Sequence, residues 1–302
     1  MKPKHSSAGT VLVLLAAVFW GSMGLFVRYL SAQGFDPIQI TSCRLSIGAL
    51  CFIVLALLKD GLSIRLRDLP LFLGLGLGSV LFFTVCYFTA ITMMSLSTAA
   101  ILLYTSPIWV MLLSAVFLHQ SLNPKKLLAL ALAFGGCVLV SGLSGGAISV
   151  KGLVIGLCSG LGYGLYSILG SVALRRYSAY TVTAWTFLIA ALGSWLLRSP
   201  VETLALLSPA PLRLGLFLVL TALVTAVIPF LAYTLGLQRV EPGKAAILAT
   251  VEPLVAALLG VLAFHEPMTL SAACGILLIL SSVVLLSLRP HDHSEKEGQT
   301  LD

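Results

Sequence analysis

Long apolar segments, each close to 20 residues and separated by short polar stretches, follow one another along almost the whole chain. A helix needs about 20 residues to cross the roughly 30 Å of hydrocarbon in a bilayer, and in lipid its backbone groups must bond to one another. We therefore predict an all-α integral membrane protein with ten transmembrane helices. The predicted helices span residues 10–30, 36–58, 70–92, 97–118, 126–143, 151–173, 179–198, 212–236, 244–264 and 270–288.

The composition excludes a soluble protein. Of the 302 residues, 59% are hydrophobic and only 10% are charged, whereas soluble domains carry about 25% charged residues. The formal charge of +7 does not indicate a nucleic-acid partner, because Lys and Arg stand singly or in pairs between apolar segments and form no basic face. The expected partner of the outer surface is the lipid bilayer.

The basic residues predict the orientation, because cytoplasmic connections carry an excess of Lys and Arg. Most of the 18 Lys and Arg residues fall on the cytoplasmic side when the N-terminus is placed there. The first apolar segment is longer than the core of a signal peptide and nine more follow it, so we expect it to be retained. We predict a cytoplasmic N-terminus over residues 1–9 and a disordered cytoplasmic tail over residues 289–302.

The second half of the chain repeats the first at an offset of 146 residues. The matching pairs are Tyr87 with Tyr233, Pro107 with Pro253, His119 with His265, and residues 99–102 with residues 245–248. We predict two five-helix repeats, over residues 10–143 and 151–288. Because five is odd, the second copy enters the membrane from the opposite side. Such inverted repeats are typical of secondary transporters, whose substrate site lies where the halves meet.

Several segments resemble the EamA family of the drug/metabolite transporter superfamily. They are Phe19-Trp20-Gly21, the Arg44 segment, the Pro107 helix and residues 245–266. The resemblance implies a ten-helix carrier of the inner (cytoplasmic) membrane, with a central cavity lined by helices 1, 3, 4, 6, 8 and 9. It also implies a small-molecule substrate, often an amino acid or another small metabolite. One departure is Gln120 in the first copy where the second has Glu266.

Glu252 is the leading candidate for a functional residue. Of the 11 acidic residues it alone lies well inside an apolar helix, eight residues after Lys244, which is about 12 Å at 1.5 Å per residue. A carboxylate at that depth costs several kcal/mol unless it is protonated, paired or facing water. We predict that Glu252 binds a proton or balances a cationic substrate. The alternative is a protonated carboxyl bonded to a neighbouring helix.

Aromatic residues supply the other candidates for substrate binding. Tyr and Trp offer a flat apolar face with one polar group, and six of them fall on helices that the family resemblance places around the cavity. We expect about half of the six to touch substrate. They are Trp20, Tyr87, Tyr104, Tyr163, Tyr166 and Tyr233.

Other conspicuous residues are expected to be structural. Arg44 lies near the outer end of the second helix; we expect its side chain to extend toward the interface, and the alternative is that it pairs with a carboxylate or with substrate. His119 and His265 are expected at helix ends. Glycines that recur every fourth residue from Gly152 to Gly164 predict close helix packing. The six cysteines lie in apolar segments without a CxxC pair, so we predict neither a disulfide, nor a metal site, nor a cofactor.

These features favour a secondary active transporter that moves a small metabolite by alternating access. A membrane-embedded enzyme is the alternative of a different class, but the chain lacks an HExxH motif and paired intramembrane aspartates and has no nucleotide-binding loop. A non-transporting membrane subunit would leave Glu252 and the inverted repeat without a reason. A proton is the candidate coupling ion, and either a monomer or a homodimer is compatible with the sequence.

Overall fold

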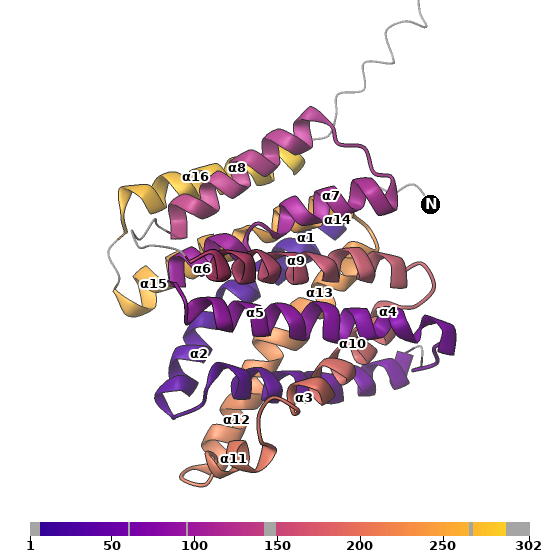
Figure 1. Ribbon diagram of the computed structural model, residues 1–302, viewed down its shortest axis with the longest axis vertical. Helices are drawn as coiled ribbons and strands as arrows, with labels where there is room; N and C mark the ends of the chain where they lie inside the picture. The colour runs from indigo at the N-terminus through magenta and orange to yellow at the C-terminus, as the bar shows by residue number, and fades with distance from the viewer. Residues whose placement is uncertain (1–6, 60, 95, 142–148, 266–267, 288–302) are drawn as a thin grey trace, which may run out of the picture.

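The computed structural model describes residues 7–59, 61–94, 96–141, 149–265 and 268–287, and the regular structure in these ranges is helical. The predicted tail falls outside them. Most helices lie across the view of Figure 1 and are stacked along its long axis. The pair α8 and α16 forms one edge of this bundle, and α11 and α12 lie at the opposite edge (Figure 1).

The first half contains five spans, several of them interrupted. The first span is α1 (Ser7–Gly21) with α2 (Met23–Ala32), and the second is α3 (Pro37–Lys59). The third runs from η1 (Leu66–Asp68) through α4 (Leu69–Leu73) and the π-helical η2 (Gly74–Leu81) to α5 (Phe82–Ile91). The fourth is α6 (Leu96–Leu103) with α7 (Ser106–Leu118), and the fifth is α8 (Pro124–Ser141).

The second half repeats this plan. Its spans are α9 (Val150–Ala173); α10 (Ala179–Ser194); α12 (Pro211–Ala222) with the π-helical η3 (Leu223–Val227) and α13 (Ile228–Leu237); α14 (Pro242–Ala249) with α15 (Val251–Phe264); and α16 (Leu270–Ser287). The short α11 (Pro200–Ala205), in the connection before α12, was not predicted. Among the described residues, eight spans have the length and hydropathy to cross a bilayer, and α10 and α16 are shorter apolar helices. The predicted all-helical membrane fold is confirmed.

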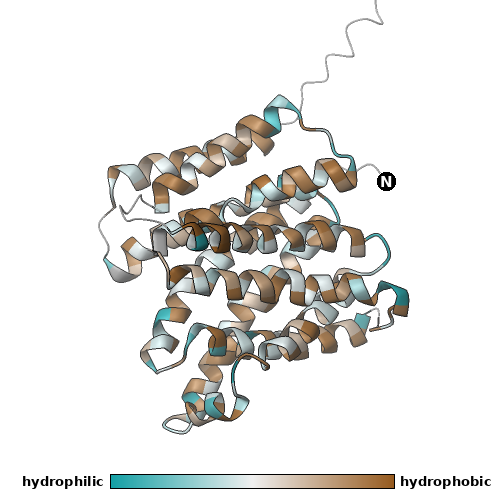
Figure 2. Ribbon diagram, in the orientation of Figure 1, coloured by the Kyte–Doolittle hydropathy of each residue, from teal (hydrophilic) through white to brown (hydrophobic). Residues whose placement is uncertain are grey.

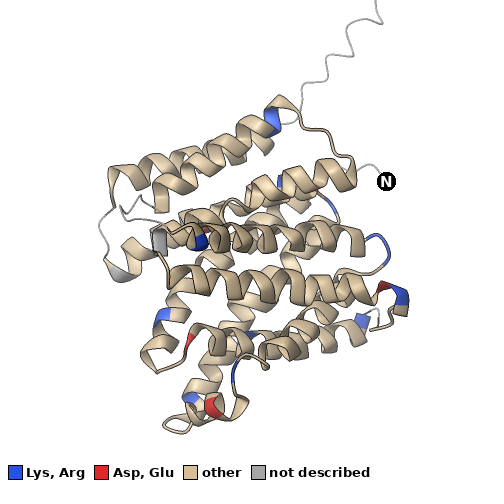
Figure 3. Ribbon diagram, viewed as in Figure 1, with Lys and Arg blue, Asp and Glu red and all other residues tan. Residues whose placement is uncertain are grey.

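The outer surface of the bundle is apolar. Large hydrophobic side chains such as Leu50, Phe117 and Leu262 are at least 66% exposed, which only a lipid environment makes favourable. Hydrophobic residues dominate the helices in Figure 2, and charged residues gather mostly at helix ends and connections in Figure 3. The arrangement fits a protein surrounded by hydrocarbon along its helices and by water at their ends.

The same irregularities occur in both halves at the 146-residue offset. The π-helical segments end at Leu81 and Val227, and the interrupted helices break after Leu103 and Ala249. The helices that follow are capped by His119 and His265, whose φ angles of 52° and 54° lie in the left-handed region. Shared irregularities of backbone geometry are stronger evidence of a repeat than shared apolar residues, since any membrane helix is apolar.

Two of the contacts between the copies are made by equivalent helices. The fifth spans, α8 and α16, cross where Gly136 meets Gly275, and a Cβ on Gly136 would lie 2.7 Å from the Gly275 carbonyl oxygen. The second spans, α3 and α10, also pack together, with Gly48 against the ring of Phe187. Small residues at these crossings let the backbones approach closely.

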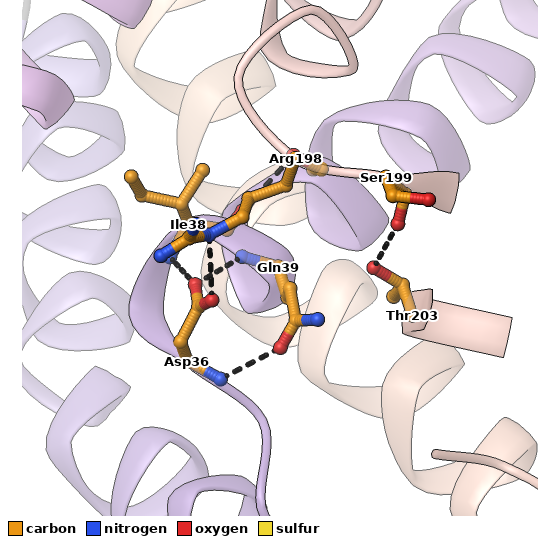
Figure 4. Close-up of polar contacts among 7 residues, drawn as sticks. Asp36, Ile38, Gln39, Arg198, Ser199 and Thr203 are labelled. Atoms are coloured by element: carbon orange, nitrogen blue, oxygen red, sulfur yellow. Dashed lines mark hydrogen bonds and ion pairs between the residues drawn. The ribbon is translucent and has the colours of Figure 1, made fainter. Parts of the chain in front are cut away.

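Polar contacts hold the α3–α10 pair at both ends. At one end Arg198 pairs with Asp36 at 2.8 Å, and the other carboxylate oxygen of Asp36 accepts the backbone N–H groups of Ile38 and Gln39 at the start of α3 (Figure 4). At the other end, in the segment that follows α3, the Gly61 carbonyl oxygen accepts from the Thr181 hydroxyl at 3.1 Å and the Leu62 carbonyl oxygen accepts from the Trp185 indole N–H at 2.8 Å. The antiparallel pair is therefore tied at both ends, by an ion pair at one end and by hydrogen bonds to backbone carbonyls at the other.

The predicted glycine stripe packs against the fourth span. A Cβ on Gly156 would lie 2.3 Å from a Leu102 side-chain carbon, and one on Gly160 would lie 2.7 Å from the Leu102 carbonyl oxygen. A Cβ on Gly164 would lie 3.1 Å from the Ser106 carbonyl oxygen. The absence of side chains on this face of α9 brings two helices from different copies into backbone contact.

Candidate functional site

A cavity of about 490 Å³ lies between two groups of helices. In one group α1 packs against α13 and α15, and in the other α9 packs against α5 and α7, which are the equivalent helices of the opposite copies. The six spans expected from the family resemblance all line the cavity, and α3 and α10 contribute as well. It reaches one end of the bundle, since Pro37 at the start of α3 and Ile91 at the end of α5 are among its walls.

Glu252 stands beside the helix break in the fourth span of the second copy. Pro253 has no N–H to give the carbonyl four residues earlier, and that residue, Ala249, is where α14 ends. Pro107 has the same relation to Leu103, where α6 ends in the first copy. At the break the Thr250 hydroxyl turns back to the Ile247 carbonyl at 2.6 Å. The proline thus places Glu252 in the first turn of a new helix.

The Glu252 carboxyl lines the cavity and is partly exposed to it. Its Oε2 accepts a hydrogen bond of 3.0 Å from the hydroxyl of Tyr163 on α9, across the gap between the two groups of helices. The first span breaks at the same level. A Cβ on Gly21 would lie 2.7 Å from the Glu252 carbonyl oxygen, so only glycine lets the end of α1 pack there.

Arg44 does not lie where the sequence suggested. Its side chain does not extend to the interface but is only 8% exposed, and it lines the same cavity as Glu252. Nη2 donates to the Thr225 carbonyl oxygen at 2.8 Å. That carbonyl is available because Pro229, four residues later, has no N–H to donate to it. Arg44 and Glu252 are close enough to attract each other electrostatically, but no ion pair within 4.0 Å joins them in the described part of the chain.

Four of the six candidate aromatics line the cavity: Trp20, Tyr87, Tyr104 and Tyr163. Trp20 contacts three other aromatic rings. Its ring centroid lies 6.1 Å from that of Tyr163, 5.2 Å from that of Phe230 and 5.3 Å from that of Tyr233. Edge-to-face arrangements at these distances are favourable. The cavity therefore ends on a wall of packed rings.

Tyr166 and Tyr233 lie behind this wall, beside a second pocket of about 20 Å³. Their hydroxyls are paired with neighbours: Tyr166 with Thr234 and Tyr233 with Ser167, each at 2.7 Å. Trp20 and Tyr163 line both spaces. The structure therefore brings four of the predicted aromatics together with Glu252 and places two on the closed side of the ring wall.

The sequence matches the EamA-like transporter family over residues 7–142 and 150–288, one match for each copy of the repeat. The chain belongs to this family. It is therefore a multi-pass membrane transporter, as its sequence resemblance indicated.

Relatives of this EamA-family chain are named as transporters. It is 32% identical to an uncharacterized transporter of Archaeoglobus fulgidus over 92% of this chain and 95% of that protein. It is 25% identical to the uncharacterized transporter YwfM of Bacillus subtilis over 96% and 97%. The pseudopaline exporter CntI of Pseudomonas aeruginosa is 32% identical over 57% of this chain and 58% of that protein.

A solved crystal structure shares the fold. Its TM-score is 0.76, at 19% sequence identity, and the match covers 93% of this chain and 96% of the other. The arrangement of helices is thus retained at low sequence identity.

The sequence predicted that Glu252 faces this EamA-family cavity, but it favoured an interfacial position for Arg44, which lines the same cavity. Position along the helix suggested an interfacial arginine, because depth alone does not say which neighbour a side chain meets. A usable signal was present in Pro229, which removes the α-helical donor of the Thr225 carbonyl. The meeting of that carbonyl with Arg44, 181 residues apart, depends on how the two halves pack.

Proposed function

We propose that this EamA-family chain is a secondary active transporter that moves a small metabolite, an amino acid or a related amine, across the cytoplasmic membrane by alternating access. The observation that carries the proposal is a cavity of about 490 Å³ between the two equivalent groups of helices, with the Glu252 carboxyl in its wall. Ligand sites of small molecules occupy about 300–1,000 Å³. The volume suits a metabolite and is too small for a folded partner.

The asymmetry of the two pockets supports alternating access. On one side of Trp20 the cavity extends to the end of the bundle, and on the other Tyr166 and Tyr233 close the path around a space of about 20 Å³. The two groups of helices are related by the repeat, so the packing that closes one side can form on the other in an exchanged conformation. With the N-terminus in the cytoplasm, the open side faces outward.

Glu252 is the proposed coupling group. The equivalent position in the first copy is Ser106, so the carboxyl is specific to one half and packing does not require it. It either carries a proton between the two faces or balances a cationic group of the substrate. Export is the proposed direction, and the name of the relative CntI, an exporter, supports it.

Uptake into vesicles tests the proposal. Purified protein is reconstituted and exposed to radiolabelled amino acids and amines, with and without an imposed pH gradient. Uptake above protein-free vesicles that responds to the gradient is the expected result. A membrane-embedded enzyme would convert a substrate without accumulating it, and a non-transporting subunit would do neither. Either of those results would reject the transporter proposal for this chain.

A further inference from the structure

The two groups of helices pack tightly against each other at the end of the bundle opposite the cavity mouth. At this closed end α14 packs against α7 and α9, and Figure 1 shows α7 and α14 side by side. The repeat relates α14 to α6 and α7 to α15, but no comparable packing joins α6 to α15 in the part of the chain that the structure describes. The closed end therefore contains contacts that must break when the cavity opens there.

An ion pair crosses this closed end. Lys126, at the start of α8, donates from Nζ to Oε2 of Glu241, the residue before α14, at 2.5 Å. The same Nζ donates to the Ser121 carbonyl oxygen at 3.2 Å, in the connection that follows α7. The Lys126 and Glu241 side chains are only 16% and 26% exposed, so solvent screens their attraction less than at an open surface. The pair ties the first copy of the repeat to the second.

Lysines from both copies lie near Glu241. Lys125 belongs to the first copy and Lys244 to the second, and Lys244 is close enough to be repelled by Lys125 and attracted by Glu241. Like charges at short range oppose the packing that brings them together. The Glu241 carboxylate therefore offsets a repulsion that would otherwise push α14 away from the connection between α7 and α8.

The repeat does not conserve this ion pair. At the offset of 146 residues, Ala272 corresponds to Lys126 and Ser95 corresponds to Glu241. The α3–α10 pair differs in this respect, because polar contacts tie it at both of its ends. An attraction that acts at one end only favours the conformation in which that end is closed.

We propose that Lys126 and Glu241 form a gate ion pair, which holds the closed end of the bundle shut and must break in each transport cycle. This inference rests on the proposed function, because it assigns a control of the same alternating access. With the gate ion pair formed, the protein favours the conformation whose cavity opens at the opposite end. Glu241 does not line the cavity, so it sets the equilibrium between conformations without contacting substrate.

Thiol labelling at two positions measures this equilibrium. Ala246→Cys reports on the closed side, because Ala246 is 6% exposed and lines the small pocket, whereas Ala256→Cys reports on the open cavity. Each change is made in a background without native cysteines, and the purified protein is treated with a methanethiosulfonate reagent. With Glu241 in place, position 256 should react fast and position 246 slowly. Glu241→Gln should raise the rate at position 246 about tenfold or more, as loss of a charge-assisted hydrogen bond implies.

Charge reversal distinguishes a gate ion pair from a merely structural contact. Lys126→Glu should speed labelling at position 246, and the added change Glu241→Lys should restore the slow rate, because the attraction forms again with its signs exchanged. Asp68→Asn is the matched control. Asp68 pairs with Arg176 at 2.8 Å, but that pair joins η1 to the residues after α9, within one group of helices, so labelling at position 246 should not change. Thermal unfolding shows whether each variant is folded.

The outcomes separate this inference from the proposed function. An unchanged rate at position 246 in folded Glu241→Gln protein would overturn the gate ion pair, while vesicle uptake by the parent protein would still uphold a transporter. A charge-reversed pair that fails to restore the slow rate would also overturn it. The predicted labelling in a protein without uptake would reject the proposed function but uphold the pair as a contact that separates two conformations. If Glu241→Gln does not fold, the comparison of Lys126→Glu with the charge-reversed pair decides.

Discussion

Glu252 and Arg44 carry opposite charges and line one cavity, whose wall also contains Arg28. Glu252 and Arg44 both lie within apolar spans, where an unpaired charge costs several kcal/mol. Each is partly satisfied by a group from another helix, Glu252 by the Tyr163 hydroxyl and Arg44 by the Thr225 carbonyl. Neither partner is charged, so both residues retain the capacity to bind a ligand. Such incompletely paired charges are expected at binding sites and not in packed interiors.

Tyr163→Phe tests the support of Glu252. The phenyl ring keeps the packing against Trp20 and Phe83, while the donor to the carboxyl is lost. A hydrogen bond to a charged group contributes about 1.5–3 kcal/mol, so the apparent substrate affinity in vesicle uptake should fall about tenfold or more with little change in thermal stability. Tyr29→Phe, which packs on Phe217 outside the cavity, is the matched control. Equal affinity in the Tyr163 variant would contradict the role of this hydrogen bond.

Prolines at fixed distances from carbonyl groups explain where the helices are interrupted. Pro107 and Pro253 stand four residues after the last residues of α6 and α14, and Pro229 stands four residues after Thr225. In each case an N–H that would have closed the helix is missing. The positions of the helix breaks could be predicted from the sequence, because each proline removes a backbone hydrogen bond of the helix. Their use, to present Glu252 and to anchor Arg44, required the packing of neighbouring helices.

Pro253→Ala should separate stability from activity. The new N–H can bond the Ala249 carbonyl and continue the helix across Thr250, and alanine removes a proline that costs an uninterrupted helix about 3 kcal/mol. We expect thermal stability to be maintained or raised, and uptake to fall because Glu252 no longer stands at a helix start. The measurement is uptake together with the unfolding midpoint. Wild-type uptake with raised stability would show that the break is dispensable.

At the scale of the whole molecule, much of the fold followed from the sequence and less of the site did. The lengths of the apolar segments predicted the ten helices, and the matched Tyr, Pro and His residues predicted the repeat. Both features can be read directly from the sequence without knowing how the helices pack. Glu252 was recognisable since a lone carboxyl in an apolar span is costly. Arg44 was expected at the interface, and Tyr166 and Tyr233 could not be separated from the other aromatics, because the neighbours that a side chain meets depend on tertiary packing.

Membrane orientation is a second property of the whole chain, and cysteine labelling tests it. The positive-inside bias places the connection between α7 and α8 in the cytoplasm and the connection before α12 outside. Ser121 and Ser208 are exposed positions in these two connections, and each conservative Ser→Cys change is made in a background without native cysteines. In intact cells an impermeant thiol reagent should label the cysteine at position 208 and not that at position 121. The reverse pattern would invert the orientation, and labelling of both in intact cells would break the ten-helix topology.

The Glu252→Gln variant tests most directly whether Glu252 couples substrate movement through the cavity. Glutamine is nearly isosteric and can still accept from Tyr163, but it neither carries a proton nor balances a cation. Reconstituted Glu252→Gln protein should remain folded and lose uptake or its response to a pH gradient, whereas Glu202→Gln, an exposed carboxyl in α11, should behave as wild type. Uptake by Glu252→Gln at the wild-type rate, with unchanged pH dependence, would contradict the account.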